Sequence, residues 1–162
     1  MSGRERALVE EAMVRLRLSV GDSTASLPGF VQIDPLNQNR PGNPADLTKY
    51  AEEGEAVEIV AADVLDYYPC EFRSKLLGHW VSRLSRGGMI IIGTREIVEV
   101  CRYVMLGEAA NFDKLVFGPV GGQRRQSAGT LPELKSMLSL MGTTLVRSYV
   151  KDFMSYVEAI RD

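Results

Sequence analysis

The 162 residues suffice for one domain with a substantial core and are too few for two domains of ordinary size, so we expect a single domain over 1–162. Apolar residues make up 45% and charged residues 25%, a soluble globular composition that argues against disorder. The formal net charge of −2 carries no basic excess of the kind that marks a nucleic-acid or membrane surface.

The cysteines and the single histidine argue against a metal site. Cys70 and Cys101 lie far apart in the sequence without metal-ligand spacing, and His79 is the only histidine, for which we expect a packing or surface role. Two unpaired thiols are typical of a reducing compartment. The first residues contain no apolar run of signal-peptide type, and no stretch has the length of a membrane span, so we expect a cytoplasmic protein.

Helices and strands are predicted to alternate along the chain. Apolar residues with a period of two, or in short continuous runs, predict strands, and spacings of three and four predict helices. In order, the predicted elements are a helix over 4–16, strands over 15–20 and 30–33, a polar helix or turn over 46–54, a strand over 56–62, a helix over 71–84, a strand over 89–93, helices over 95–107 and 130–141, and strands over 143–149 and 153–160. Loops rich in glycine or proline are predicted over 37–44 and 117–129.

This alternation predicts an α/β fold with an open sheet. Because only 22–29 separates the first two strands, the first crossover helix is expected to be missing or reduced to a turn. The short link 150–152 predicts that the last two strands form an antiparallel hairpin. Right-handed crossovers would put helices on both faces, and ligands would bind at the carboxyl ends of the strands.

Five segments of the chain carry motifs that occur together in one known family. An apolar strand with a Val-Leu-Asp-Tyr turn occupies 57–67, and a helix that leads through Arg-Gly-Gly into an apolar strand occupies 77–92. The segments 16–22, 30–34 and 130–149 are similar to a degenerate first motif, the second strand with its terminal acid, and the helix before the final hairpin. Together the five segments resemble the class I S-adenosylmethionine-dependent methyltransferases, in a compact subgroup similar to type 11. The resemblance implies a three-layer Rossmann-like methyltransferase sheet, mostly parallel, with a C-terminal antiparallel hairpin.

The resemblance also implies a binding site for S-adenosylmethionine, which would leave as S-adenosylhomocysteine. Asp34 would accept hydrogen bonds from the ribose hydroxyls, the alternative being a turn residue before Pro35. Asp46 and Leu47 would hold the adenine amino group, and a helix N-cap is an equal alternative for Asp46. The methionine part would be contacted from turns after two strands, by Gly21, Asp22, Ser23, Ala62, Asp63 and Leu65, for which ordinary turn chemistry is the alternative.

The candidates for chemistry are Asp66 and Tyr67, which follow the third strand. Methyl transfer needs mainly alignment, so a general base is required only where the acceptor must lose a proton, and these residues would otherwise form the pocket wall. Arg124 and Arg125 would bind a phosphate or carboxylate on the acceptor, unless they are a solvated basic pair.

Three functions remain open. The first is methyl transfer to a small-molecule or glycan-precursor acceptor, without nucleic acid, membrane or metal. The second, motivated by the eroded first motif, is a catalytically silent domain that binds S-adenosylmethionine or a partner. The third, a nucleotide-sugar or dinucleotide enzyme, is disfavoured because no Gly-x-Gly-x-x-Gly opens a helix. The sequence leaves a homodimer open.

Overall fold

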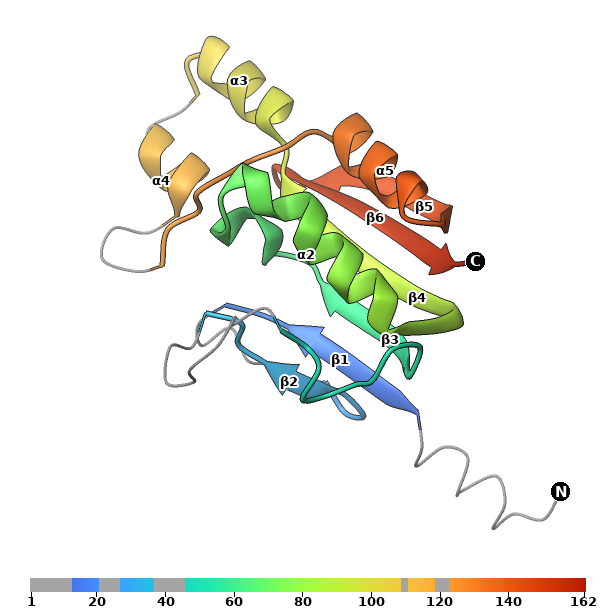
Figure 1. Ribbon diagram of the computed structural model, residues 1–162. Helices are drawn as coiled ribbons and strands as arrows, with labels where there is room; N and C mark the ends of the chain where they lie inside the picture. Colours follow the sequence, from blue (N-terminus) through green and yellow to red (C-terminus); the bar gives the residue numbers. More distant parts are fainter. Residues whose placement is uncertain (1–12, 21–26, 37–45, 109–110, 119–122) are drawn as a thin grey trace, which may run out of the picture.

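A computed structural model describes residues 13–20, 27–36, 46–108, 111–118 and 123–162, and the structural statements below concern these residues. Six strands form one sheet in the order β2-β1-β3-β4-β6-β5 (Figure 1). The strands β1 to β4 pair in parallel, and β6 pairs antiparallel with both β4 and β5. Their bounds are β1 Val14–Leu18, β2 Val31–Ile33, β3 Ala56–Ala61, β4 Leu84–Arg95, β5 Thr143–Lys151 and β6 Met154–Arg161. This confirms the predicted α/β fold, mostly parallel with a C-terminal hairpin.

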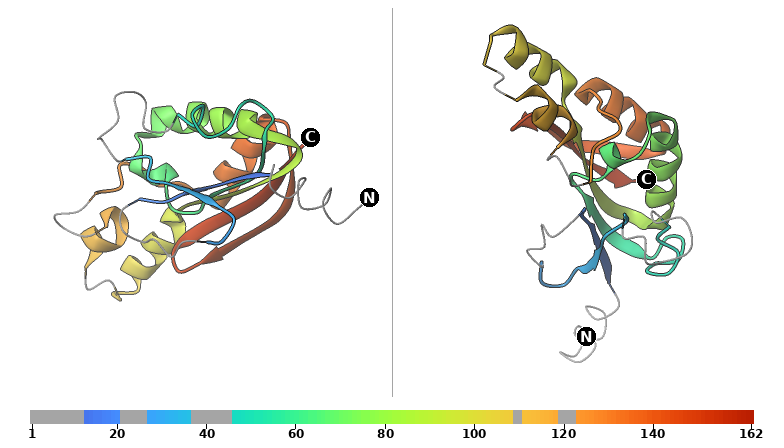
Figure 2. Two further views of the ribbon diagram at one scale, coloured as in Figure 1. Left: turned by 90° about the horizontal axis from the view of Figure 1, so that it is seen from below. Right: turned by 90° about the vertical axis from the view of Figure 1, so that its left-hand side faces the viewer.

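The helices that pack along the strands lie on the same face of the sheet. α2 (Cys70–Arg83) and α5 (Leu131–Leu140) share this face, whereas α3 (Ile97–Met105) and α4 (Phe112–Phe117) lie beyond the end of β4 (Figure 2). A short 3-10 helix, η1 (Leu65–Tyr67), links β3 to α2. None of the described helices combines the length and the apolar character needed to cross a bilayer.

The core lies between the sheet and these two helices. Alternate strand residues such as Leu16, Ile59 and Ile90 are fully buried, as a period of two requires when one face of a sheet is covered. Trp80 of α2 and Leu134 of α5 are buried against them. Each such side chain contributes about 1.5–3 kcal/mol of hydrophobic stabilisation.

The opposite face of β1 and β3 is polar and partly exposed. Arg15, Arg17 and Glu58 occupy the alternate positions there, and the Arg15 Nε lies 3.5 Å from the Glu58 carboxylate. Among the described residues, the prediction of helices on both faces is therefore not met along these strands. The reason is the short connection from β1 to β2, whose described end, 27–30, is a turn.

Several predicted boundaries are wrong. Residues 14–16 belong to β1 rather than to the predicted first helix, whose other residues up to 12 lie outside the described part. Arg86-Gly87-Gly88 lies within β4, because α2 ends at Arg83 and the chain is already extended at Leu84. The sequence also missed α4, which takes in Phe117 from the predicted loop.

The predicted start of the helix after the second loop is confirmed. The Thr130 Oγ1 accepts a hydrogen bond from the Glu133 N–H at 3.3 Å, and Pro132 lies in the first turn of α5.

Candidate functional site

The carboxyl ends of the parallel strands meet at one edge of the sheet. β1 lies between β2 and β3. The chain passes from β1 to β2 on one side of β1 and only afterwards forms β3 on the other side. In open α/β sheets, ligands bind in the crevice at such a switch point. A hollow of about 180 Å³ lies there, lined by Ser19, Val20, Leu27, Ala62 and Asp63 among others. This carboxyl edge is therefore the candidate site.

Asp34 lies at this edge, directly after β2. Its carboxylate is exposed and accepts a hydrogen bond from the Leu36 N–H at 3.0 Å, the turn geometry that the sequence offered as an alternative. The neighbouring Tyr68 hydroxyl donates to the Pro35 carbonyl at 3.3 Å. Burial raises the pKa of the Tyr68 phenol, and the negative charge of Asp34 raises it further. The turn does not exclude a ligand role for Asp34, because the carboxylate remains exposed to solvent.

Asp46 and Leu47 are fixed from α2 by the single histidine. The Leu47 N–H donates to the His79 Nε2 at 3.0 Å, and the Asp46 Oδ1 accepts from the Thr48 N–H at 2.9 Å. A hollow of about 590 Å³ adjoins this segment, and its lining includes Asp46, Tyr68, Phe72, Leu76 and His79. The sequence missed this role of His79, because nothing local links it to Leu47, 32 residues away.

The neutral form of His79 is the one that the structure favours. Burial lowers the pKa of His79, the positive charge of Arg83 lowers it further, and the carboxylate of Asp46 opposes both. The Nε2 that accepts from Leu47 must also be unprotonated.

The free energy of unfolding is therefore expected to fall as the pH drops below the ordinary histidine pKa of 6.5, because the unfolded chain takes up the proton first. His79→Gln keeps a hydrogen-bond acceptor and removes the titration. Urea unfolding at about pH 7.5 and about pH 5.5 should show a smaller loss in this variant than in the parent. Equal losses in the two proteins would contradict the assignment.

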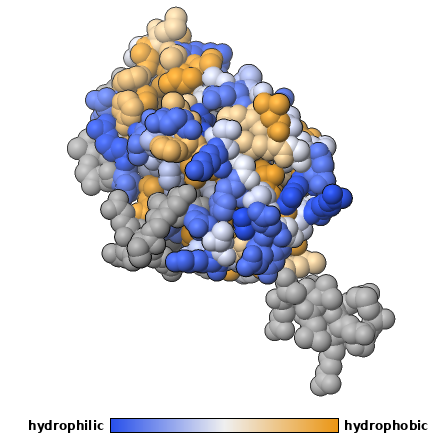
Figure 3. Space-filling view, viewed as in Figure 1, coloured by the Kyte–Doolittle hydropathy of each residue, from blue (hydrophilic) through white to orange (hydrophobic). Residues whose placement is uncertain are grey.

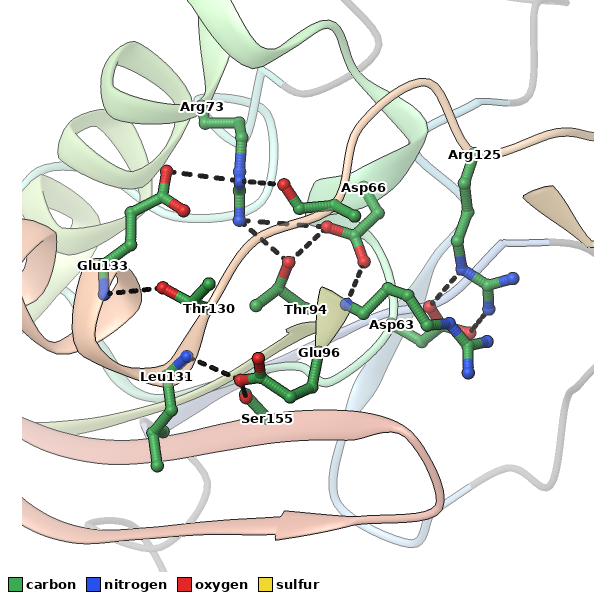
Figure 4. A network of polar contacts seen from close by, with 12 residues as sticks. Asp63, Asp66, Arg73, Thr94, Glu96, Arg125, Thr130, Leu131, Glu133 and Ser155 are labelled. Carbon is green, nitrogen blue, oxygen red and sulfur yellow. Dashed lines mark hydrogen bonds and ion pairs between the residues drawn. The ribbon is translucent and has the colours of Figure 1, made fainter. Parts of the chain in front are cut away.

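Asp66 is the centre of a buried polar network that joins η1, α2 and β4 (Figure 4). Its carboxylate is 1% exposed and accepts hydrogen bonds from the Thr94 hydroxyl and the Arg95 N–H. The Nη2 of Arg73 lies 3.8 Å from the same carboxylate. Burial raises the pKa of Asp66, while Thr94, the Arg95 N–H and Arg73 hold it down. These contacts favour a positioning role for Asp66 over direct contact with an acceptor.

The residues 123–129, which we call the strap, are held against η1 and the end of β4. The backbone N–H groups of Gln126 and Ser127 donate to the Asp66 carbonyl at 2.7 and 3.0 Å. Arg73 donates to the Ala128 carbonyl at 3.0 Å, and the Gly129 N–H donates to the Arg95 carbonyl at 3.0 Å. The described residues 123–129 of the predicted loop thus belong to the carboxyl edge.

Arg125 separates from its neighbour in the strap. Its guanidinium binds the Asp63 carboxylate through two hydrogen bonds, of 2.7 and 3.3 Å, and lies 5.4 Å from the centre of the Tyr67 ring. Arg124 is exposed and lies over the Phe117 ring instead. The structure therefore brings together residues predicted separately as cofactor-binding (Asp63), catalytic (Tyr67) and acceptor-binding (Arg125).

Of the remaining candidate site residues, some are placed less favourably for contact with a ligand or for catalysis, and others lie outside the described residues. Leu65 is fully buried in the core, so only its backbone can face a ligand. Burial raises the pKa of the Tyr67 phenol, which opposes a role as a general base. Gly21, Asp22 and Ser23 lie outside the described residues. In the described part of the chain, His, Cys, Asp and Glu form no group of three that could hold a metal ion.

Comparison with known proteins assigns the fold. No protein-family model and no curated protein matches the sequence. Among solved structures, the chain is similar to the N-methyltransferase NodS from Bradyrhizobium japonicum, with a TM-score of 0.55, 16% identity and coverage of 98% of this chain and 95% of that one. Magnesium protoporphyrin IX methyltransferase from Synechocystis with bound SAM gives a TM-score of 0.55 and 16% identity over 97% and 76% of the two chains. An O-methyltransferase family protein from Burkholderia thailandensis gives 0.51 and 13% over 82% and 35%.

The fold is that of the S-adenosylmethionine-dependent methyltransferases. At these identities the likeness concerns the methyltransferase fold alone. The chain spans about half of a second structure of the Synechocystis enzyme, with bound SAH (51%), and about a third of the Burkholderia protein (35%).

Two buried residues that organise this methyltransferase fold were missed from the sequence. Glu96 is 4% exposed and accepts hydrogen bonds from the Val98 N–H at the start of α3, the Leu131 N–H at the start of α5 and the Ser155 hydroxyl. Arg73 is 2% exposed within α2. A signal for Arg73 existed, since it lies three and four residues before Leu76 and Leu77, on the apolar stripe of the helix.

Proposed function

We propose that this protein binds S-adenosylmethionine along the carboxyl edge of its sheet and transfers the methyl group to an acceptor. The observation that carries the proposal is the hollow at the switch point beside β1, with an exposed carboxylate, Asp34, at the end of the neighbouring strand. The methyltransferase fold of the chain supports it.

We assign one part of the cofactor to each of these regions. The methionine part would occupy the hollow lined by Val20, Ala62 and Asp63. The ribose would lie against Asp34, and the adenine would enter the hollow beside Asp46, where Tyr68 offers an aromatic wall. This order follows the sequence of strand ends across the sheet, and it uses both an apolar wall and carboxylate acceptors.

For methyl transfer, this edge mainly has to align the acceptor with the methyl donor. The acceptor must lie in line with the methyl carbon and the sulfonium sulfur, and a base is needed only where the acceptor must lose a proton. Because Asp66 is enclosed by its partners and Tyr67 lies under Arg125, we propose that both position the strap and η1 rather than move protons.

The replacement of Asp34 by alanine is expected to weaken the binding of S-adenosylmethionine and S-adenosylhomocysteine by about tenfold to a hundredfold, as the loss of a carboxylate that accepts two hydroxyl hydrogen bonds implies. Isothermal titration calorimetry measures this directly. Asp162→Ala is the matched control, because this carboxylate binds Thr144 near the opposite edge of the sheet. Equal affinity in Asp34→Ala and the parent would overturn the assigned site.

Calorimetry also separates the proposal from the silent alternative. No binding of either ligand by the parent protein would overturn the proposed function. Binding combined with methyl transfer from labelled S-adenosylmethionine to candidate acceptors supports the enzyme, whereas binding without transfer to any acceptor class favours a silent binding domain.

A further inference from the structure

A third hollow lies at the carboxyl edge, beyond β4, with a volume of about 400 Å³. Its lining comes from the end of β4, from α3 and α4, and from the turn between β5 and β6, and includes Arg95, Tyr103, Glu108, Asn111, Lys114 and Phe153. We infer that this hollow is the acceptor site and that it selects an acceptor with a ring and an anionic group, a carboxylate or a phosphate. This inference rests on the proposed function for the identity of the ligand as an acceptor.

The first observation is a strained aromatic residue in the wall. The turn between β5 and β6 consists of Asp152 and Phe153, with φ angles of 51° and 61°. Two-residue hairpins of this kind favour asparagine and glycine, and a bulky residue at positive φ is an outlier. Such strain concentrates at ligand-binding positions. The sequence placed this turn at 150–152 and so missed that Phe153 belongs to it.

The strained turn presents one half of an aromatic pair. The Phe153 ring packs edge-on against Tyr103 of α3, with ring centres 5.1 Å apart and an angle of 70°. The Phe153 carbonyl accepts from the Glu96 N–H at 2.8 Å, which fixes the turn to the end of β4. Both rings are only partly buried and line the hollow, so they offer a wall for a ring of the ligand.

The second observation is a cation in the wall of the hollow, Arg95, whose Nε has no hydrogen-bond partner among the described residues. The Nε is buried, whereas the side chain as a whole is only partly buried and lines the hollow. Buried polar groups are nearly always paired, so a turn of the Arg95 side chain toward an anion in the hollow would give this nitrogen a partner that the described residues do not supply. Lys114 adds a second cation to the wall and Glu108 one carboxylate, which leaves the three side chains with a net positive charge.

Two of the nearby carboxylates, Asp63 and Asp66, already have partners. Asp63 binds Arg125 through both oxygens, and Asp66 binds Thr94 and the Arg95 backbone N–H. An anion in the hollow would therefore meet Arg95 and Lys114 without displacing an internal ion pair. Asp63, which follows the adjacent strand β3, also lines the proposed methionine hollow.

The surroundings of the hollow favour a ligand with apolar surface. Apolar residues gather over α3 and α4, at the upper left of Figure 3. The exposed members of this group include Val104, Met105, Leu106 and Phe112. A small anion without a ring would leave this wall and the aromatic pair without a function.

The test uses three probes with the full chain and without S-adenosylmethionine: benzoate, phenyl phosphate and neutral benzamide. In ¹H–¹⁵N NMR titrations, we expect at least one anion to bind more tightly than benzamide and to shift the amide resonances of Arg95, Tyr103 and Phe153. The two anions distinguish a carboxylate from a phosphate site. Benzamide binding as tightly as both anions, or no shifts with any probe, would overturn the inference.

Two variants test the roles of the cation and of the aromatic ring separately. Arg95→Gln is expected to weaken anion binding by about tenfold, the loss of one charge-assisted hydrogen bond, and to leave benzamide unchanged. Phe153→Asn keeps a residue suited to positive φ and should weaken all three probes without loss of fold. Arg102→Gln is the control, because this exposed α3 arginine pairs with Glu99 at 2.6 Å.

Unchanged anion binding in Arg95→Gln would overturn the role of the guanidinium. Because the titration omits the methyl donor, its outcome is independent of the calorimetry above. Anion binding here together with failed binding of S-adenosylmethionine would refute the proposed function and keep the site.

Discussion

The replacement of Arg73 by methionine is expected to lower the free energy of unfolding by about 3–5 kcal/mol, the cost of leaving a buried charge without its partner. Methionine preserves the apolar length of the side chain and removes the cation 3.8 Å from the Asp66 carboxylate. It also removes the donor to the Ala128 carbonyl, so the strap loses one of its attachments. Urea unfolding followed by circular dichroism measures the loss.

The pH dependence of the same variant identifies Asp66 as the cause. Burial already raises the pKa of Asp66, and the replacement of Arg73 removes one of the groups that lower it. A carboxyl group whose pKa is raised in the folded state lowers the free energy of unfolding as the pH rises from its ordinary pKa toward the raised one. The difference in the free energy of unfolding between Arg73→Met and the parent should therefore shrink as the pH falls toward 3.8.

Two further variants make the assignment falsifiable. The addition of Asp66→Asn to Arg73→Met should recover part of the loss at neutral pH, because it removes the buried charge and keeps an acceptor. The exposed Arg102→Met should change the free energy of unfolding by no more than about 0.5 kcal/mol. A pH-independent loss in Arg73→Met that Asp66→Asn does not relieve would mean that packing, rather than charge, explains the effect.

The strands and the main helices could be predicted because their signals are local. Along most of β3 and β6, buried residues alternate with partly buried ones, and the pair Thr130 and Glu133 marks the start of α5. The site could be predicted only as a set of strand ends, since its contacts join residues far apart in sequence. Arg73 lies 60 residues from Glu133, and Glu96 lies 59 from Ser155. Nothing local marks such pairs.

The two arginines of the strap illustrate the same limit. In the sequence, Arg124 and Arg125 are equivalent cations in a glycine-rich stretch. In the structure, one is buried against Asp63 and the other is exposed, because the strap is anchored by the Asp66 carbonyl immediately after them. Residue type therefore predicted the presence of a cation, and only the tertiary fold decides which one is available to a ligand.

The replacement of Gly93 by alanine is expected to destabilise the protein by about 3 kcal/mol, at the upper end of the cost of overpacking. A Cβ at this position in β4 would lie 1.9 Å from the Ala62 carbonyl oxygen and 3.1 Å from the Tyr156 ring. The Tyr156 ring can rotate away from the new Cβ. The Ala62 carbonyl belongs to the backbone directly after β3, so the main chain itself must move. Thermal unfolding measures the loss as a lower Tm.

The displaced backbone is also the backbone of the proposed site, because Ala62 lines the methionine hollow. Gly93→Ala should therefore weaken S-adenosylmethionine binding even at temperatures where the variant stays folded. Gly78→Ala is the matched control: a Cβ there, within α2, has no atom within 4 Å, and alanine should stabilise the helix by about 0.5–1 kcal/mol. A loss of stability in Gly93→Ala with unchanged affinity for S-adenosylmethionine would mean that the end of β3 does not contact the ligand. The methionine part of the cofactor would then have to be assigned elsewhere on this edge.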